Sequence, residues 1–271
     1  MTPADRKPNP PPIRLYRYAR TCVHLGAGVA TTLFVFPLVS AQRRRALIKR
    51  WSRRLLRILA VETRVRGAIA APGGNVLVVA NHISWLDIFV LNSVHPVRFV
   101  AKAEIARWPI IGSWIRDAGT LFIERSRRRD THRVNSRVAE VLAGGDVVAI
   151  FPEGMTTDGL DMLPFKSSLL QPIVEAAGHV QPVAIRYRAT DGSVSVAPAY
   201  VGETTFAESF WQVCGVRALT VELIATKALP ARDGHRRVLA RAAQESIRTA
   251  LAEPDAATEP ASRGDPRGES R

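Results

Sequence analysis

Five consecutive apolar residues, Val76–Ala80, are the feature that most constrains the fold of this chain. A run of this length and composition is typical of a short strand that is buried on both faces. Two polar residues, Asn81 and His82, follow at once, and a helical pattern begins near Ser84. A strand, a polar turn and a helix in this order predict an α/β fold in which the carboxyl end of the strand faces a ligand site.

Short apolar runs alternate with helical patterns along residues 60–252, which we predict to be an α/β domain with a mixed, largely parallel sheet flanked by helices. We expect strands over residues 62–66, 76–80, 98–101, 120–123, 147–151, 180–186, 193–197 and 218–225. We expect helices over residues 84–94, 110–117, 131–143, 166–177, 206–213 and 235–251. Composition predicts a disordered lead-in over residues 1–12 and a disordered tail over residues 253–271.

The chain of 271 residues is strongly basic, with 38 Lys and Arg residues against 24 Asp and Glu residues. An excess of this size predicts contact with a polyanion, either nucleic acid or an anionic lipid surface. Aromatic residues make up only 7% of the chain, which disfavours a stacking platform for single-stranded nucleic acid. The two cysteines, Cys22 and Cys214, are too few and too far apart for a disulfide framework or a zinc cluster, and they indicate a reducing compartment.

Residues 13–59 are predicted to form a membrane-associated segment of two helices. The stretch from Thr21 to Val39 contains no charged residue, and its length approaches that of a membrane span. Basic residues flank it on both sides and Pro37 interrupts it, so we favour a segment that enters the membrane and stays on one face. Residues 42–59 are basic with apolar residues at helical spacing, which is typical of an interfacial helix. The two helices together predict a membrane-docking hairpin.

Two other interpretations of this segment carry less weight. Residues 39–41 resemble the cleavage site of a signal peptide, but the arginines that follow would oppose export. A pair of DNA-binding helices would need a helix-turn-helix spacing, which is absent from the sequence, and a less apolar first helix. We therefore expect anionic membrane lipids as partners, and no nucleic acid.

His82 and Asp87 lie five residues apart, so they meet if the histidine is on the turn and the aspartate is one turn into the helix. A carboxylate that accepts from one imidazole nitrogen fixes the tautomer and raises the basicity of the other nitrogen. The competing interpretation is that Asn81 and Ser84 cap the helix and His82 is an ordinary surface histidine. The sequence has no metal-binding motif, nucleophile elbow or phosphate-binding glycine loop. A base without a protein nucleophile fits acyl transfer to a substrate that brings its own hydroxyl.

Three further places would serve such a reaction, and each has a simpler interpretation. Arg125 follows the strand predicted over residues 120–123, where a guanidinium can bind a phosphate, although a solvated basic loop has the same composition. Lys102 follows the strand over residues 98–101 and is a second candidate cation. Glu153 belongs to a Pro-Glu-Gly turn at the end of a third strand, where it presents a carboxylate beside a cleft or is only part of a turn.

Four ordered blocks of the chain resemble those of the lysophospholipid acyltransferase family, whose type member is the bacterial 1-acylglycerol-3-phosphate acyltransferase. Each block alone is weak, but the order and the spacing of all four match the family. The blocks are Asn81-His82-x-x-x-x-Asp87, Gly119-x-x-Phe122-Ile123-x-Arg125, Phe151-Pro152-Glu153-Gly154 and Val180-x-Pro182-Val183.

The resemblance implies a membrane-associated acyltransferase at the cytoplasmic face of the bacterial inner membrane. The acyl donor would be a thioester of coenzyme A or acyl carrier protein, and neither a metal nor a bound cofactor is implied. His82 would be the general base and Asp87 its partner. Four more residues are implied to bind the lyso-lipid acceptor, namely Lys102 and Arg125 through its anionic headgroup and Glu153 and Gly154 by shaping its site.

The third block departs from the family pattern. Members that act on lysophosphatidate commonly continue with Thr-Arg-Ser after Glu-Gly, whereas this chain has Met155-Thr156-Thr157, and its next cation is Lys166. The expected acceptor is 1-acylglycerol-3-phosphate, giving phosphatidate in phospholipid biosynthesis. A lyso-ornithine lipid is the alternative acceptor, because it lacks a glycerol phosphate. Two other classes of function stay open: a non-catalytic basic protein that binds membranes or nucleic acid, and a soluble hydrolase that uses the same histidine with water.

Overall fold

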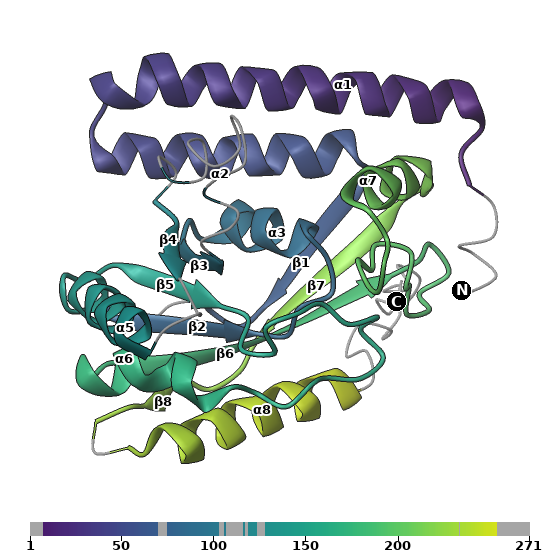
Figure 1. The fold of residues 1–271 in the computed structure, drawn as a ribbon. Helices are drawn as coiled ribbons and strands as arrows, with labels where there is room; N and C mark the ends of the chain where they lie inside the picture. Colours follow the sequence, from purple (N-terminus) through teal and green to yellow (C-terminus); the bar gives the residue numbers. More distant parts are fainter. Residues whose placement is uncertain are drawn as a thin grey trace, which may run out of the picture.

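The structure is a computed structural model that describes residues 8–69, 75–102, 106, 116, 119–123, 128–232 and 234–253. Within these ranges one eight-stranded sheet has helices on both faces (Figure 1). The strands are β1 (Val61–Arg66), β2 (Val76–Ala80), β3 (Arg98–Lys102), β4 (Leu121–Ile123), β5 (Val147–Ile150), β6 (His179–Arg188), β7 (Leu219–Ala225) and β8 (Leu229–Pro230). The helices are α1 (Pro11–Ala30), α2 (Ala41–Ile58), α3 (Leu86–Val94), α5 (Arg128–Ala143), α6 (Gln171–Glu175), α7 (Phe206–Gly215) and α8 (Arg236–Ala252).

The sheet has the strand order β1-β7-β6-β2-β5-β3-β4, with β8 paired to β6 beside this path. Five neighbouring pairs are parallel, and the two pairs that join β6 to β7 and to β8 are antiparallel. The predicted class, a mixed and largely parallel α/β sheet flanked by helices, is therefore confirmed. The strand β2 lies between β6 and β5, so the polar turn that follows it opens at the middle of the sheet.

The strand β2 holds the two hydrophobic layers together because successive side chains of a strand point to opposite faces. Val76, Val78 and Ala80 face the layer that contains α2, α3 and α7. Leu77 and Val79 face the layer that contains α5, α6 and α8. All five residues have 0% exposure, as expected for a strand of a parallel sheet that is covered on both faces.

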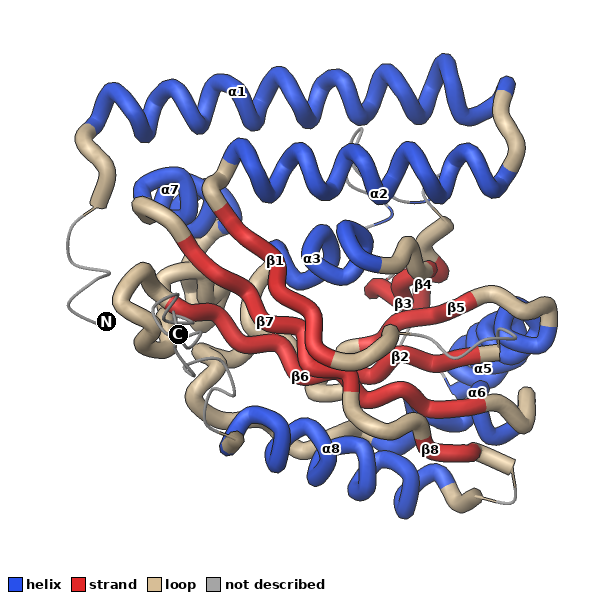
Figure 2. Tube along the Cα trace, turned by 180° about the vertical axis from the view of Figure 1, so that it is seen from behind, coloured by secondary structure: helices blue, strands red, loops and turns tan. Residues whose placement is uncertain are grey.

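The N-terminal segment forms the expected pair of helices, which lie side by side across one face of the α/β layers (Figure 2). The helix α1 continues through a π turn and a 3-10 turn, which contains Pro37, and α2 begins after Ser40, whose side chain accepts from the N–H of Arg43. His24 and Trp51 join the two helices: their rings stack with centroids 4.5 Å apart, and each ring contacts the backbone carbonyl of the other residue. We call α1 and α2 with their connection the helical hairpin.

The prediction of a disordered lead-in is wrong for residues 8–12. The helix α1 begins at Pro11, because proline at the first helical position has the required φ and needs no partner for an N–H. The side chain of Asn9 donates to the carbonyl of Val216 at 2.9 Å, which ties this end of the chain to α7. Residues 1–7 and 254–271 lie outside the described residues.

Three predicted elements differ from the structure or fall outside it. Residues 193–197 are not a strand, because turns surround them and they form only an isolated bridge with β6 through Val194. The helix predicted over residues 166–177 is split into a 3-10 turn, Ser167–Leu170, and α6, with Pro172 in the first turn of the latter. Of the helix predicted over residues 110–117, only Arg116 is described. The strand β8 was missed because its two residues are too few for any periodicity.

Trp51 provides a test of the packing between the hairpin and the α/β layers. Its ring stacks on His24, contacts Phe89 of α3 and is largely enclosed, so Trp51→Ala is expected to lower the free energy of unfolding by about 3 kcal/mol. Trp211→Ala is the comparison: its ring also contacts Tyr18 and Arg14 of α1, but Trp211 is 39% exposed, so less buried area is lost with it. Urea unfolding followed by circular dichroism would compare them, and an equal loss in both variants would contradict the packing described here.

Candidate active site

The carboxylate of Asp87 is the centre of the candidate site. It lies in the first turn of α3, is fully buried, and accepts from the ring nitrogen Nδ1 of His82 at 2.8 Å. The same oxygen, Oδ2, also accepts from the backbone N–H groups of Ile83 at 2.7 Å and Ser84 at 2.9 Å. These donors stabilise the negative charge at a helix N-terminus, where the helix dipole is also favourable. The contact between His82 and Asp87 that the spacing predicted is present.

Tyr187 completes the surroundings of Asp87 and was missed by the sequence analysis. Its hydroxyl donates to the second carboxylate oxygen, Oδ1, at 2.7 Å from the strand β6. Burial and the neighbouring charge of Asp87 raise the pKa of Tyr187 well above its ordinary value, so the phenol keeps its proton and stays a donor. The sequence gives only a weak signal for this contact. Tyr187 lies one residue beyond the predicted strand and shares a face with Ile185, so it could be expected to be buried. A buried phenol needs a hydrogen-bond acceptor.

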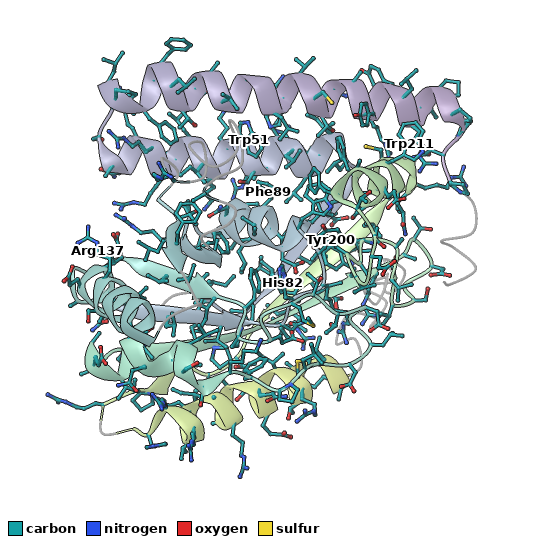
Figure 3. All side chains as sticks on the ribbon, viewed as in Figure 1. Trp51, His82, Phe89, Arg137, Tyr200 and Trp211 are labelled. Carbon is teal, nitrogen blue, oxygen red and sulfur yellow. The ribbon has the colours of Figure 1, made fainter. Side chains whose placement is uncertain are left out.

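The ring of His82 is held in one plane by aromatic contacts. It stacks on Phe151 with centroids 3.9 Å apart and an interplanar angle of 9°, and Phe151 in turn stacks on Phe99 at 6.0 Å. The His82 side chain is 19% exposed, and Figure 3 shows it near the middle of the molecule, beyond the carboxyl end of β2. With Nδ1 bonded to Asp87, Nε2 is the nitrogen that can accept a proton from a substrate.

Glu153 connects the histidine turn to the third block. The carboxylate is 1% exposed, and its two oxygens accept from the backbone N–H groups of His82 and Leu163, each at 2.8 Å. Burial raises the pKa of Glu153, although these two hydrogen bonds oppose the shift. The backbone N–H of Thr157 donates back to the carbonyl of His82 at 2.8 Å. Glu153 therefore positions two loops through backbone contacts, and Gly154 follows it with a φ of +80°, which favours glycine.

Asn81 and Ser84 have separate tasks in the structure. The side-chain amide of Asn81 donates to the carbonyl of Ile185 at 2.9 Å and accepts from its N–H at 2.8 Å, so it joins β2 to β6 and does not cap α3. Ser84 is buried, and its Oγ accepts from the N–H of Leu86 at 3.3 Å. The N-cap position of α3 is Trp85 and no side chain caps the helix there, so the simpler interpretation of the turn as a helix capped by Asn81 and Ser84 is wrong.

The two candidate cations lie at or beyond the edge of the described residues. Lys102 is the last residue of β3, where its backbone pairs with Ile123 of β4, but its side chain lies outside the described part of the chain. Arg125 lies outside it entirely. Their assignment to the acceptor headgroup stays a prediction.

An apolar cavity of about 130 Å³ lies between the hairpin, α3 and β3. Figure 3 shows two of its residues, Trp51 and Phe89, between the layers of α2 and α3. Phe99 lines the cavity and belongs to the stack of rings that ends at His82, so the cavity and the imidazole are neighbours across Phe151. Other lining residues are Gly28, Thr31, Thr32, Phe36, Leu47, Ile48, Ser52, Ile88, Asn92, Val97 and Thr120.

A histidine oriented by a buried carboxylate at the end of a central strand can activate a hydroxyl group, and an adjoining apolar cavity suits an aliphatic chain. Fold and site thus define the class of an acyl-transferring enzyme that acts on lipids. The family model described as "Acyltransferase" matches residues 62–186, which contain His82, Asp87 and Glu153, while Tyr187 lies one residue beyond the match.

Two curated relatives specify the class further. The chain is 39% identical over 189 residues to the 1-acyl-sn-glycerol-3-phosphate acyltransferase of Neisseria gonorrhoeae, covering 69% of this chain and 73% of that protein. It is 38% identical over 208 residues to the lyso-ornithine lipid O-acyltransferase of Pseudomonas aeruginosa, covering 77% of this chain and 79% of that protein. The chain therefore belongs to the lysophospholipid acyltransferase family and is a lyso-lipid acyltransferase.

A solved structure supports the fold independently. The 1-acyl-sn-glycerophosphate (LPA) acyltransferase PlsC from Thermotoga maritima superposes with a TM-score of 0.66 at 22% identity, and the match covers 90% of this chain and 96% of that chain. A match of this extent includes most of the chain, so the α/β architecture is shared well beyond residues 62–186.

Tyr187→Phe tests whether the phenol positions Asp87. A hydrogen bond to a charged group is worth about 1.5–3 kcal/mol, so kcat is expected to fall about 10–100-fold while the fold is kept. The resonance of the His82 Nδ1 proton in NMR spectra should shift, which loss of packing alone would not cause. Ser93→Ala is the control, because it removes a buried hydroxyl of α3 that donates to Val90. An unchanged kcat in Tyr187→Phe would contradict the positioning.

Glu153→Gln tests the connection between the two loops. The amide would place an NH₂ group against one of the two backbone N–H donors, so the free energy of unfolding is expected to fall by about 1–3 kcal/mol. The value of kcat/KM should fall as well, because the turn that carries His82 loses its anchor. Glu203→Gln, at an exposed loop position, is the control for loss of a carboxylate. Full stability and activity of Glu153→Gln would contradict this account.

Proposed function

We propose that His82 is the general base of the acyl transfer. Nε2 takes the proton from the free hydroxyl of the lyso-lipid as that oxygen attacks the carbonyl carbon of a fatty acyl thioester. The new C–O bond forms, the C–S bond breaks, and the thiolate leaves with the proton from the imidazolium. Asp87 stabilises the imidazolium between these steps. The observation that carries this proposal is the bond of 2.8 Å from Nδ1 to a buried and fully hydrogen-bonded carboxylate.

The donor is proposed to be a thioester of coenzyme A or of acyl carrier protein, and the apolar cavity is proposed to hold an acyl chain. The cavity supports this because it is lined mainly by apolar side chains and adjoins the stacked rings of Phe99, Phe151 and His82. A chain seated there would bring a reacting carbonyl towards the imidazole without exposing the chain to water.

The acceptor is proposed to be 1-acylglycerol-3-phosphate, bound through Lys102 and Arg125, with phosphatidate as product. The relative from Neisseria gonorrhoeae supports it. A lyso-ornithine lipid is the second candidate. The loop after Glu153 supports this candidate, because Thr156 stands where the family pattern has an arginine. The exposed carboxylates of Asp158 and Asp161 follow in the same loop, and such groups attract an ammonium. The relative from Pseudomonas aeruginosa supports it too.

The helical hairpin is proposed to dock the enzyme on the cytoplasmic face of the bacterial inner membrane. Residues Pro11–Leu38 form a helix long and apolar enough to cross a membrane by length and composition, and an 18-residue stretch within it has a mean hydropathy of 1.6. Large apolar side chains nevertheless project from its outer side, as Val23 (74% exposed), Phe34 (73%) and Leu38 (84%) show. The hairpin packs on α3 and α7 through its other side, so the helix lies along the domain, as an interfacial helix does.

His82→Ala tests the reaction. Purified protein would be offered lysophosphatidate and lyso-ornithine lipid in parallel, each with acyl-coenzyme A and with acyl-acyl carrier protein. The variant is expected to lose about 10²–10⁴-fold of the acyl transfer, because general-base assistance has this magnitude. His179→Ala, an exposed residue at the start of β6, should keep full activity.

The other possible results of this experiment distinguish between the two acceptors and between the possible classes of function. Preference for lyso-ornithine lipid would replace the first acceptor by the second. Full activity of His82→Ala would refute the general base, and vesicle binding by the wild type without any acyl transfer would favour a non-catalytic membrane protein. Hydrolysis of the thioester without lyso-lipid would indicate a hydrolase.

A further inference from the structure

Four arginine side chains converge on one open pocket between the two helices of the hairpin. Arg20 comes from α1, and Arg50, Arg54 and Arg57 come from α2, with Ile58 beside them. The three arginines of α2 are spaced by four and three residues, which places them on one face of the helix. We call these four residues the arginine pocket.

The arginine pocket has no counter-charge of its own. Within the described residues, no carboxylate lies at salt-bridge distance from its four guanidinium groups, and α2 contains no Asp or Glu along its 18 residues. Four like charges that share one pocket repel one another, and a bound anion removes this cost. The exposed arginines of α8 differ, because Arg237 and Arg241 share their pocket with Glu245.

The place of the arginine pocket selects the kind of anion. Arg20 lies on α1 among residues of its apolar outer side, and its guanidinium lies 5.3 Å from the ring centroid of Tyr16, which is 60% exposed. Packed helices are about 8–10 Å apart, and an interfacial helix places its apolar face about 5–10 Å into the boundary between headgroups and acyl chains. With the outer side of α1 at that boundary, the flank of α2 is level with the phosphate groups.

We propose that the arginine pocket binds the phosphate group of an anionic membrane phospholipid. Guanidinium groups bind phosphate oxygens bidentately, and several of them around one phosphate can satisfy all of its oxygens. This proposal rests on the docking of the hairpin described under the proposed function and deepens it. A bound headgroup fixes the rotation of the hairpin about the axis of α1, and thereby the direction in which the attached α/β domain and its apolar cavity face the bilayer.

The double variant Arg50→Gln/Arg54→Gln tests the proposal. Its matched control is Arg237→Gln/Arg241→Gln, which removes two exposed arginines with the same spacing from a helix on the other face of the sheet. Binding to vesicles of phosphatidylcholine with and without phosphatidylglycerol would be measured by co-sedimentation at several salt concentrations, without substrates. The α2 variant is expected to bind phosphatidylglycerol vesicles about 30-fold more weakly than the wild type, because each arginine near an anionic surface adds to the affinity. The α8 control should lose much less.

A second variant, Arg20→Gln, keeps the test independent of α2, because it removes a guanidinium of the arginine pocket from the other helix. Circular dichroism would show that each variant is folded. Equal losses in the α2 variant and the α8 control would overturn the proposal, since binding would then follow net charge alone. The wild type could also bind inorganic phosphate or coenzyme A as tightly as it binds phosphatidylglycerol vesicles. If the α2 variant lost that binding, the result would overturn the proposal in favour of a soluble anion. If the wild type bound acyl carrier protein and the α2 variant did not, the result would overturn the proposal in favour of an acidic protein as the partner.

The failure of this proposal and of the proposed reaction can be distinguished. A wild type that binds phosphatidylglycerol vesicles through the arginine pocket but transfers no acyl group would refute the reaction and leave the lipid site intact. A wild type that transfers acyl groups in detergent micelles but does not prefer phosphatidylglycerol vesicles would refute the lipid site and leave the reaction intact.

Discussion

The buried carboxylate of Asp87 is the interaction on which the rest of the structure depends. An ionised carboxylate away from water is costly unless its oxygens are hydrogen-bonded, and this one accepts from His82, Ile83, Ser84 and Tyr187. The donors come from the turn after β2 and from β6, so satisfying one charge fixes the position of α3 against the middle of the sheet. The same bonds orient the imidazole, which means that the stability of the turn and the orientation of the His82 ring have one physical cause.

A second buried carboxylate, that of Glu153, extends this arrangement to the third block. Both of its oxygens accept from backbone N–H groups, one of them from His82 itself, so the two loops that meet at the site are rigidly related. Phe151, two residues before Glu153, covers one face of the imidazole. The short segment that we expected to shape the acceptor site therefore holds His82 in place, through its backbone contacts and its ring.

The hairpin is the part of the structure that we propose to dock on a lipid surface. Its inner side contacts α3, the helix that carries Asp87, through Trp51 and Phe89, and encloses the apolar cavity there. Its outer side is apolar along α1, and one flank of α2 carries the arginine pocket. An enzyme whose acceptor resides in a bilayer gains from such a layer, because the domain does not have to extract the lipid fully into water before the hydroxyl meets the base.

The local patterns of the sequence were sufficient for the class of fold, for the hairpin and for the pair of His82 and Asp87. Strand and helix periodicity, and contacts between residues five positions apart, are set by neighbours along the chain. The partners from distant positions required the tertiary structure. Tyr187 lies 100 residues from Asp87, and Asn81 bonds to a strand 104 residues away, because the sheet places β6 beside β2. Strand order depends on how all the helices pack, and no local period encodes it. For the same reason residues 193–197 have the composition of a strand and yet form none: their turns leave them a single bridge to β6.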